Sequence, residues 1–161
     1  MPMDVAQRWD ICESVVYIIL KYLWINVYSP DKNSDDRWFD YEFDYMDYDF
    51  RLQVKSVNIS EITIVSDSIR YDLKVSNNNK LFQYSNSIPN RKSILMLIIV
   101  PEDERELVSL SEEDLFIKCQ IYWLNSFQES DNSSTVTVWI PKENQICDSS
   151  NLSSLIERWL A

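Results

Sequence analysis

The chain has 161 residues, of which 45% are hydrophobic and 13% aromatic, and this suits one globular domain with one core. It contains no glycine and no histidine, which excludes glycine-rich phosphate loops, Ser-His-Asp and Cys-His catalysis, and histidine-containing zinc sites. Acid–base or metal chemistry must therefore use Asp, Glu, Lys and Tyr, and carboxylate oxygens favour Mg²⁺ or Mn²⁺. The net charge of -11 disfavours strong autonomous binding to nucleic acid.

The cysteines and the apolar stretches indicate the compartment. Cys12, Cys119 and Cys147 are odd in number and widely spaced, which predicts reduced core thiols. Residues 1–10 lack the basic region of a signal peptide. Residues 15–28 are too short and too polar to span a bilayer. We therefore expect a soluble, cytoplasmic protein that does not insert into a membrane.

The first element is an amphipathic helix over residues 4–23. Its apolar stripe recurs at spacings of three and four: Val5, Trp9, Cys12, Val16, Ile19 and Leu23. Glu13 falls on the border of this stripe, and Asp10 lies on the far side. Residues 24–28 suggest a strand that stops before Pro30, and a polar loop follows over 31–37.

Two segments with strict alternation come next and predict a hairpin. Apolar and acidic residues alternate over 39–45, and apolar and polar or basic residues alternate over 50–55, with the turn at 46–49. The expected register pairs Tyr45 with Phe50. The pairs on the polar face are then Asp44 with Arg51, Glu42 with Gln53, and Asp40 with Lys55.

The rest of the chain alternates strands and helices. We expect strands over 61–65, 93–100, 117–124 and 135–140, and helices over 71–82 and 151–160. The near-continuous apolar run 93–100 is typical of a central strand buried on both faces. A capping pattern at 111–114 predicts a further short helix. No repeat or linker divides the chain, so residues 1–161 form one predicted domain.

The hairpin carries the only arrangement suited to chemistry. Hydrolysis of a phosphodiester with Mg²⁺ needs carboxylates for the metal and a cation that orients water and offsets the charge on phosphorus. Asp40, Gln53 and Lys55 provide such groups on one face of the hairpin. From the alternation alone, plain cross-strand pairs on an exposed hairpin are the favoured interpretation.

A series of motifs in fixed order favours the chemical interpretation. The chain shows Asp36-Arg-Trp-Phe-Asp40, Gln53-Val-Lys55-Ser56, Tyr71-Asp-Leu-Lys74, an apolar strand before Pro101, Tyr122-Trp123 and Thr135-Val-Thr-Val-Trp-Ile-Pro141. This series resembles a bacterial family known as domain of unknown function 4365, which is related to the PD-(D/E)xK nucleases. The resemblance covers nearly the whole chain.

The resemblance implies a restriction-endonuclease-like α/β fold, with a mixed central sheet flanked by helices. It implies Asp40 and Gln53 as ligands of Mg²⁺ or Mn²⁺, Lys55 as the catalytic lysine, and Glu13 as a further catalytic acid. Glu42, opposite Gln53 in the expected register, is a substitute metal ligand. The bulky Trp38 and Phe39 depart from the Gly-Ile that precedes the key aspartate in the family.

Two functions follow from this resemblance. The first is a metal-dependent nuclease that cuts DNA or RNA, with a role in bacterial defence. The alternative is a catalytically inert relative that binds a protein partner, which the net charge of -11 favours. A small acidic antitoxin or DNA mimic is a third class, and it requires acids spread over one convex face.

Overall fold

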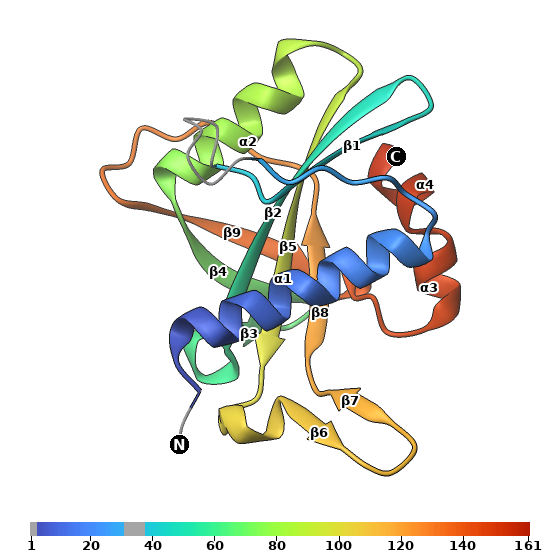
Figure 1. Ribbon diagram of the computed structural model, residues 1–161. Helices are drawn as coiled ribbons and strands as arrows, with labels where there is room; N and C mark the ends of the chain where they lie inside the picture. The colour runs from blue at the N-terminus through green and yellow to red at the C-terminus, as the bar shows by residue number, and fades with distance from the viewer. Residues whose placement is uncertain (1–2, 31–37) are drawn as a thin grey trace.

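The computed structural model describes residues 3–30 and 38–161. Four strands form a central sheet in the order β1-β2-β5-β8, with β2 parallel to β5 and the two outer pairs antiparallel (Figure 1). The strands are β1 (Tyr41–Tyr45), β2 (Tyr48–Asn58), β5 (Arg91–Val100) and β8 (Gln120–Leu124). The expected mixed α/β fold with helices beside a mixed sheet is confirmed.

Helix α1 (Val5–Tyr22) crosses one face of this sheet, as Figure 1 shows. Asp4 and Gln7 form a capping box at its start, so the first turn satisfies its own amide groups. The buried residues of the helix pack on alternate residues of β2 and β5 in the larger hydrophobic cluster. Val5 and Trp9 are 69% and 37% exposed, so the predicted stripe is buried only from Cys12 onward.

A second layer covers the other face of the central sheet. It consists of helix α2 (Val75–Ser87) and an antiparallel sheet of order β3-β4-β9. Its strands are β3 (Thr63–Val65), β4 (Ser68–Lys74) and β9 (Thr135–Pro141). A second hydrophobic cluster fills this interface. Strand β5 is thus buried on both faces, as its apolar run predicted.

Short elements complete the chain. The 3₁₀ turns are η1 (Ile59–Glu61), η2 (Glu104–Glu106) and η3 (Lys142–Asn144), and strands β6 (Val108–Leu110) and β7 (Leu115–Ile117) form a separate hairpin. The predicted C-terminal helix is divided into α3 (Ser149–Ser153) and α4 (Leu155–Leu160), and α4 buries Leu155, Ile156 and Trp159. No helix within residues 3–30 and 38–161 is long and apolar enough to cross a membrane.

Two predicted elements were wrong, and a third, the helix predicted over 71–82, begins four residues later than expected. Residues 24–28 are not a strand, because Trp24 has a φ of 61° and only Tyr28 forms a bridge, to Glu42. The segment 71–74 is the end of β4, where pairing with β9 overrides helix propensity, and α2 starts only at Val75. Residues 111–114 form a hairpin turn in which the Ser111 hydroxyl accepts the Asp114 amide without starting a helix.

The β1–β2 hairpin forms as predicted, but its register is shifted by two residues. Tyr45 pairs with Tyr48, so the loop contains only Met46 and Asp47, and Met46 adopts a φ of 53°. The tight loop suits the twist of the strands and brings the rings of Phe43 and Phe50 into a stack 4.8 Å apart. Because the shift is even, every side chain keeps its predicted face.

The cysteines fit their prediction only in part. All three are free thiols; Cys12 is buried and Cys119 is half-buried, whereas Cys147 is exposed. The expectation of a core position was therefore wrong for Cys147. Burial raises the pKa of Cys12 to about 12, helped by nearby Cys119, and burial also raises the pKa of Cys119. A raised pKa disfavours the thiolate form of both Cys12 and Cys119 at neutral pH.

Candidate active site

Asp40 lies directly before β1 and continues its hydrogen bonding to β2. Its backbone N–H donates to the Leu52 carbonyl at 2.7 Å, and its Oδ2 accepts the Val54 amide at 2.6 Å. The pairing of β1 with β2 ends at Tyr41 and Leu52, and the bond from the Asp40 amide to Leu52 holds Asp40 beside this last pair. Its carboxyl group is therefore held against β2 at Val54, and the predicted cross-strand pairing with Lys55 was wrong.

Gln53 is buried, with 3% of its surface exposed. Its Nε2 donates to the Trp38 carbonyl at 2.5 Å, and this contact fixes the orientation of the amide because a carbonyl can only accept. Gln53 Oε1 is buried without any hydrogen-bond partner in the described chain. We expected this face of the hairpin to lie outside the core, and that was wrong, because α2 and the β3-β4-β9 sheet cover it.

An unpaired buried carbonyl costs about 1–3 kcal/mol, so Gln53 Oε1 requires an explanation. A hard cation would supply one, because amide and carboxylate oxygens are the ligands that Mg²⁺ and Mn²⁺ prefer. Asp40 presents only Oδ2 to the Val54 amide, which leaves Oδ1 for another partner. Asp40 and Gln53 therefore each offer an oxygen of the kind that binds a divalent cation.

Lys55 follows Gln53 on the same face of β2 and is half-buried. Burial lowers its pKa, the charge of Asp40 raises it, and that of Lys74 lowers it further. Burial raises the pKa of Asp40 to about 6, against the opposing effects of the Val54 amide and Lys55. The two side chains therefore influence each other in a poorly solvated setting, which is typical of functional sites.

Helix α1 brings a further carboxylate toward Asp40. Glu13 and Asp40 line the same cleft of about 420 Å³, together with Trp9, Asp10, Ser29, Pro30 and Phe39. The hydroxyl of Tyr41 donates to the Glu13 carbonyl at 2.9 Å, which ties the helix to β1. Burial raises the pKa of Tyr41, and the charges of Glu13 and Asp40 add to that effect. Lys55 and Gln53 do not line this cleft.

The structure also gives Glu42 a partner other than Gln53. Glu42 lies opposite Arg51, and its Oε1 is 3.4 Å from Arg51 Nε. The guanidinium of Arg51 in turn lies 4.3 Å from the ring centroid of Phe39 and 4.6 Å from that of Tyr84. Glu42 thus pairs with Arg51, which in turn packs against Phe39 directly before Asp40. Asp44 faces Asp49 rather than Arg51, so that predicted pair was wrong too.

The geometry sets a limit on the metal site. No group of three or more Asp, Glu, Cys or His residues converges on one point within the described part of the chain. Asp36 and Arg37 of the quoted motif lie outside the described residues. Mg²⁺ is commonly held by only one or two carboxylates and keeps several waters, so the pair of Asp40 and Gln53 remains compatible with it.

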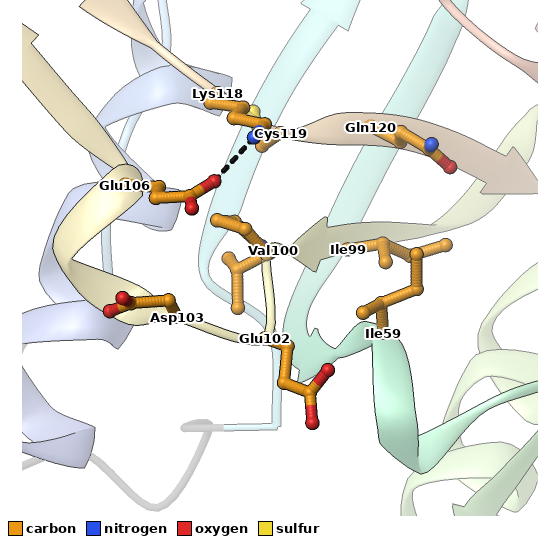
Figure 2. A pocket seen from close by; sticks show the side chains of 10 residues that line it. Ile59, Ile99, Val100, Glu102, Asp103, Glu106, Lys118, Cys119 and Gln120 are labelled. Atoms are coloured by element: carbon orange, nitrogen blue, oxygen red, sulfur yellow. Dashed lines mark hydrogen bonds and ion pairs between the residues drawn. The ribbon is translucent and has the colours of Figure 1, made fainter.

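A larger hollow, of about 490 Å³, lies at the carboxyl end of β5 (Figure 2). Glu102, Asp103 and Glu106 stand on its wall, and Lys118 forms an ion pair with Glu106 across it. None of Asp40, Gln53 or Lys55 lines this hollow. We therefore assign the candidate site to the hairpin residues on chemical grounds rather than by the size of the hollow.

Sequence reasoning missed three contributors to the site. Asp10 lines the cleft although we placed it on the far side of α1; its spacing of three from Glu13 was the available signal. Trp38 holds the Gln53 amide through its backbone carbonyl, which no side-chain pattern reveals. Tyr41 was expected in the core and is buried there, but its hydroxyl also reaches α1. No family model and no curated protein matches this chain.

Proposed function

We propose that this protein is a metal-dependent nuclease whose centre is formed by Asp40, Gln53 and Lys55. The observation that carries the proposal is the unpaired, buried carbonyl of Gln53 on β2, next to Val54, whose amide fixes the carboxyl group of Asp40. Such a carbonyl is costly unless a hydrogen-bond donor or a cation binds it, and a cation is the partner that the neighbouring carboxyl group favours. The series of motifs that resembles the PD-(D/E)xK-related family supports the same three residues.

Each residue has a distinct task in this proposal. Asp40 Oδ1 and Gln53 Oε1 would hold Mg²⁺ or Mn²⁺, with Glu13, which lines the same cleft as Asp40, as a further acid. The bound cation would polarise the phosphate and acidify a water molecule. Lys55 accepts a proton from the attacking water when neutral and offsets the negative charge on the phosphorane oxygens when protonated. Its lowered pKa favours the first of these roles.

The second candidate is an inert relative that binds a protein partner. Two observations favour it: the net charge of -11, and the lack of three converging carboxylates in the described residues. Under this alternative no cleavage of nucleic acid is expected, whether or not Asp40 and Gln53 bind a metal. A role in defence rests only on the resemblance.

Metal binding is the first test, with the melting temperature as the measurement. A ligand that binds only the folded state stabilises it, by about 2.7 kcal/mol at a concentration 100-fold above its Kd. We expect Mn²⁺ to raise the melting temperature of the wild type and to leave that of Asp40→Asn unchanged. Asp44→Asn removes a carboxylate from the same strand and should respond as the wild type does. An equal response of wild type and Asp40→Asn would refute the site.

Cleavage is the second test and separates the two candidates. Supercoiled DNA, single-stranded DNA and single-stranded RNA are incubated with the protein and Mn²⁺. We expect wild type to cut at least one substrate, and Lys55→Met to bind Mn²⁺ but to lose cleavage by at least about 100-fold, as expected for loss of a proton-transfer group. Metal binding without any cleavage would favour the inert relative.

A further inference from the structure

Strands β6 and β7 form a hairpin that belongs to neither larger sheet, and Figure 1 shows it extending from the end of the molecule where β5 stops. Its apolar side chains face solvent: Leu110 is 80% exposed, Leu115 63% and Phe116 56%. An isolated two-stranded ribbon is marginally stable in water and gains stability from a further strand or a packed face. The hairpin is therefore a candidate interaction surface.

Strand β7 has a free edge with unpaired backbone groups. The backbone amide of Lys118 donates to the Leu107 carbonyl, and the backbone amide of Ser111 donates to the Asp114 carbonyl, both at 2.8 Å. In an antiparallel ladder the hydrogen bonds between two strands fall on alternate residues. The amides and carbonyls of Leu115 and Ile117 consequently point away from β6. In the described chain, β6 is the only strand that pairs with β7.

The sequence along this edge is complementary to itself. The segment reads Asp114-Leu-Phe-Ile-Lys118. If two copies pair antiparallel about Phe116, Leu115 of one copy meets Ile117 of the second, and their outward amides and carbonyls form the ladder. Asp114 then meets Lys118 of the second copy at both ends. One face of the new ribbon thus carries a Phe116 pair flanked by two ion pairs.

We propose that β7 is a homodimerisation edge and that two copies of the chain join their hairpins into one four-stranded antiparallel sheet. The two-fold axis passes beside Phe116, as a symmetric interface requires. Lys118 pairs with Glu106 of its own chain, and its ammonium is exposed (Figure 2). Because an ammonium has three donors, Lys118 can bind Glu106 of its own chain and Asp114 of the second copy at the same time.

Exchange of the two charges tests this register. The full chain is examined by sedimentation velocity over a range of micromolar concentrations. We expect wild type to dimerise, Asp114→Lys and Lys118→Asp each to remain monomeric because like charges meet twice, and the double variant to dimerise again. Glu112→Lys makes the same charge change in the same turn, outside the register, and should dimerise as wild type does.

The outcomes that overturn the proposal are definite. A wild type that stays monomeric at every concentration refutes it, and leaves another protein's strand as the occupant of the edge. A Glu112→Lys variant that dissociates as fully as Asp114→Lys would show that net charge, and not this pairing, controls assembly. Failure of the double variant to recover the dimer would reject the antiparallel register centred on Phe116.

A disulfide across the axis provides a second, independent measurement. Residues directly opposite in a non-hydrogen-bonded antiparallel pair have Cα atoms about 4.5 Å apart, which is within reach of a disulfide. In a Cys147→Ser background, which removes the exposed thiol, we expect Phe116→Cys to form covalent dimers under mild oxidation. Leu110→Cys is equally accessible on β6 and should stay monomeric. Equal cross-linking of the two variants would contradict the pairing.

Discussion

The two hairpins of this protein differ in which side chains they bury: the β1–β2 hairpin buries polar side chains, and the β6–β7 hairpin exposes apolar ones. The β1–β2 hairpin is part of the central sheet. It buries Gln53 and partly buries Lys55, near Asp40. The β6–β7 hairpin lies outside both hydrophobic clusters except at its base and exposes Leu110, Leu115 and Phe116. Each arrangement is unfavourable for an isolated monomer, since buried polar atoms and exposed apolar patches both require a partner.

The contrast indicates where each partner would bind. In the first hairpin the unpaired group is a single carbonyl oxygen, which matches a small hard ligand such as a divalent cation. In the second, the unpaired groups are a row of backbone amides and carbonyls with apolar side chains, which match another strand. The same type of element can therefore hold an ion or a protein surface, depending on what is left unpaired.

The largest expected effect tests the difference in burial. Phe43 is fully buried against Phe50 and Trp159. We expect Phe43→Ala to lower the free energy of unfolding by about 3–5 kcal/mol, because it leaves a cavity in the core. Phe116→Ala should change the stability of the monomer by less than about 0.5 kcal/mol. Urea unfolding at a dilution where both variants are monomeric measures this, and similar losses would contradict the comparison.

The second effect is a dependence of stability on pH that only the first hairpin should show. The folded state raises the pKa of Asp40 from 3.8 to about 6, mainly by burial, so it binds more protons than the unfolded state between these values. Stability should therefore fall as pH rises through this window, by up to about 3 kcal/mol. The difference between wild type and Asp40→Asn isolates this contribution, with Asp44→Asn as the control. A slope that survives Asp40→Asn would assign it to other groups.

Metal binding should follow the same titration. A cation binds the ionised carboxylate, so Mn²⁺ must displace the proton from Asp40 below pH 6. We expect the rise in melting temperature caused by Mn²⁺ to be several-fold larger at pH 7.5 than at pH 5. Glu112→Gln in the second hairpin should not alter this difference. A Mn²⁺ effect that does not vary with pH would place the ion away from Asp40.

The smallest effect concerns the loops that close the two hairpins. Met46 has a φ of 53° and is 79% exposed, so its side chain contributes little packing while its backbone is strained. Met46→Gly should relieve this strain and stabilise the protein by about 1 kcal/mol. Glu112 in the other loop has no positive φ, and Glu112→Gly should not stabilise. Thermal unfolding checks both, and equal effects would show that the backbone angle does not matter.

The sequence by itself determined which side chains share a face. Alternation over residues 39–45 and 50–55 has a period of two, and a register error of two residues leaves that period intact. Gln53 and Lys55 therefore lie on one face of β2 as predicted, although the residues opposite them differ from the prediction, and the convergence of Asp40 with them stays a prediction. The burial of β5 and of the stripe of α1 from Cys12 onward could also be predicted, because the buried residues of a regular helix or strand recur at a fixed spacing.

Only the tertiary structure decided what those faces meet. Gln53 is buried because α2 and the β3-β4-β9 sheet cover its face, and these elements come from residues distant in the chain. Residues 71–74 form a strand because they pair with β9. The backbone carbonyl of Trp38 accepts a hydrogen bond from the Gln53 side chain, 15 residues further along the chain. Contacts of this kind depend on positions in space that local pattern does not encode, so the unpaired carbonyl at the centre of the proposed site could not have been read from the sequence.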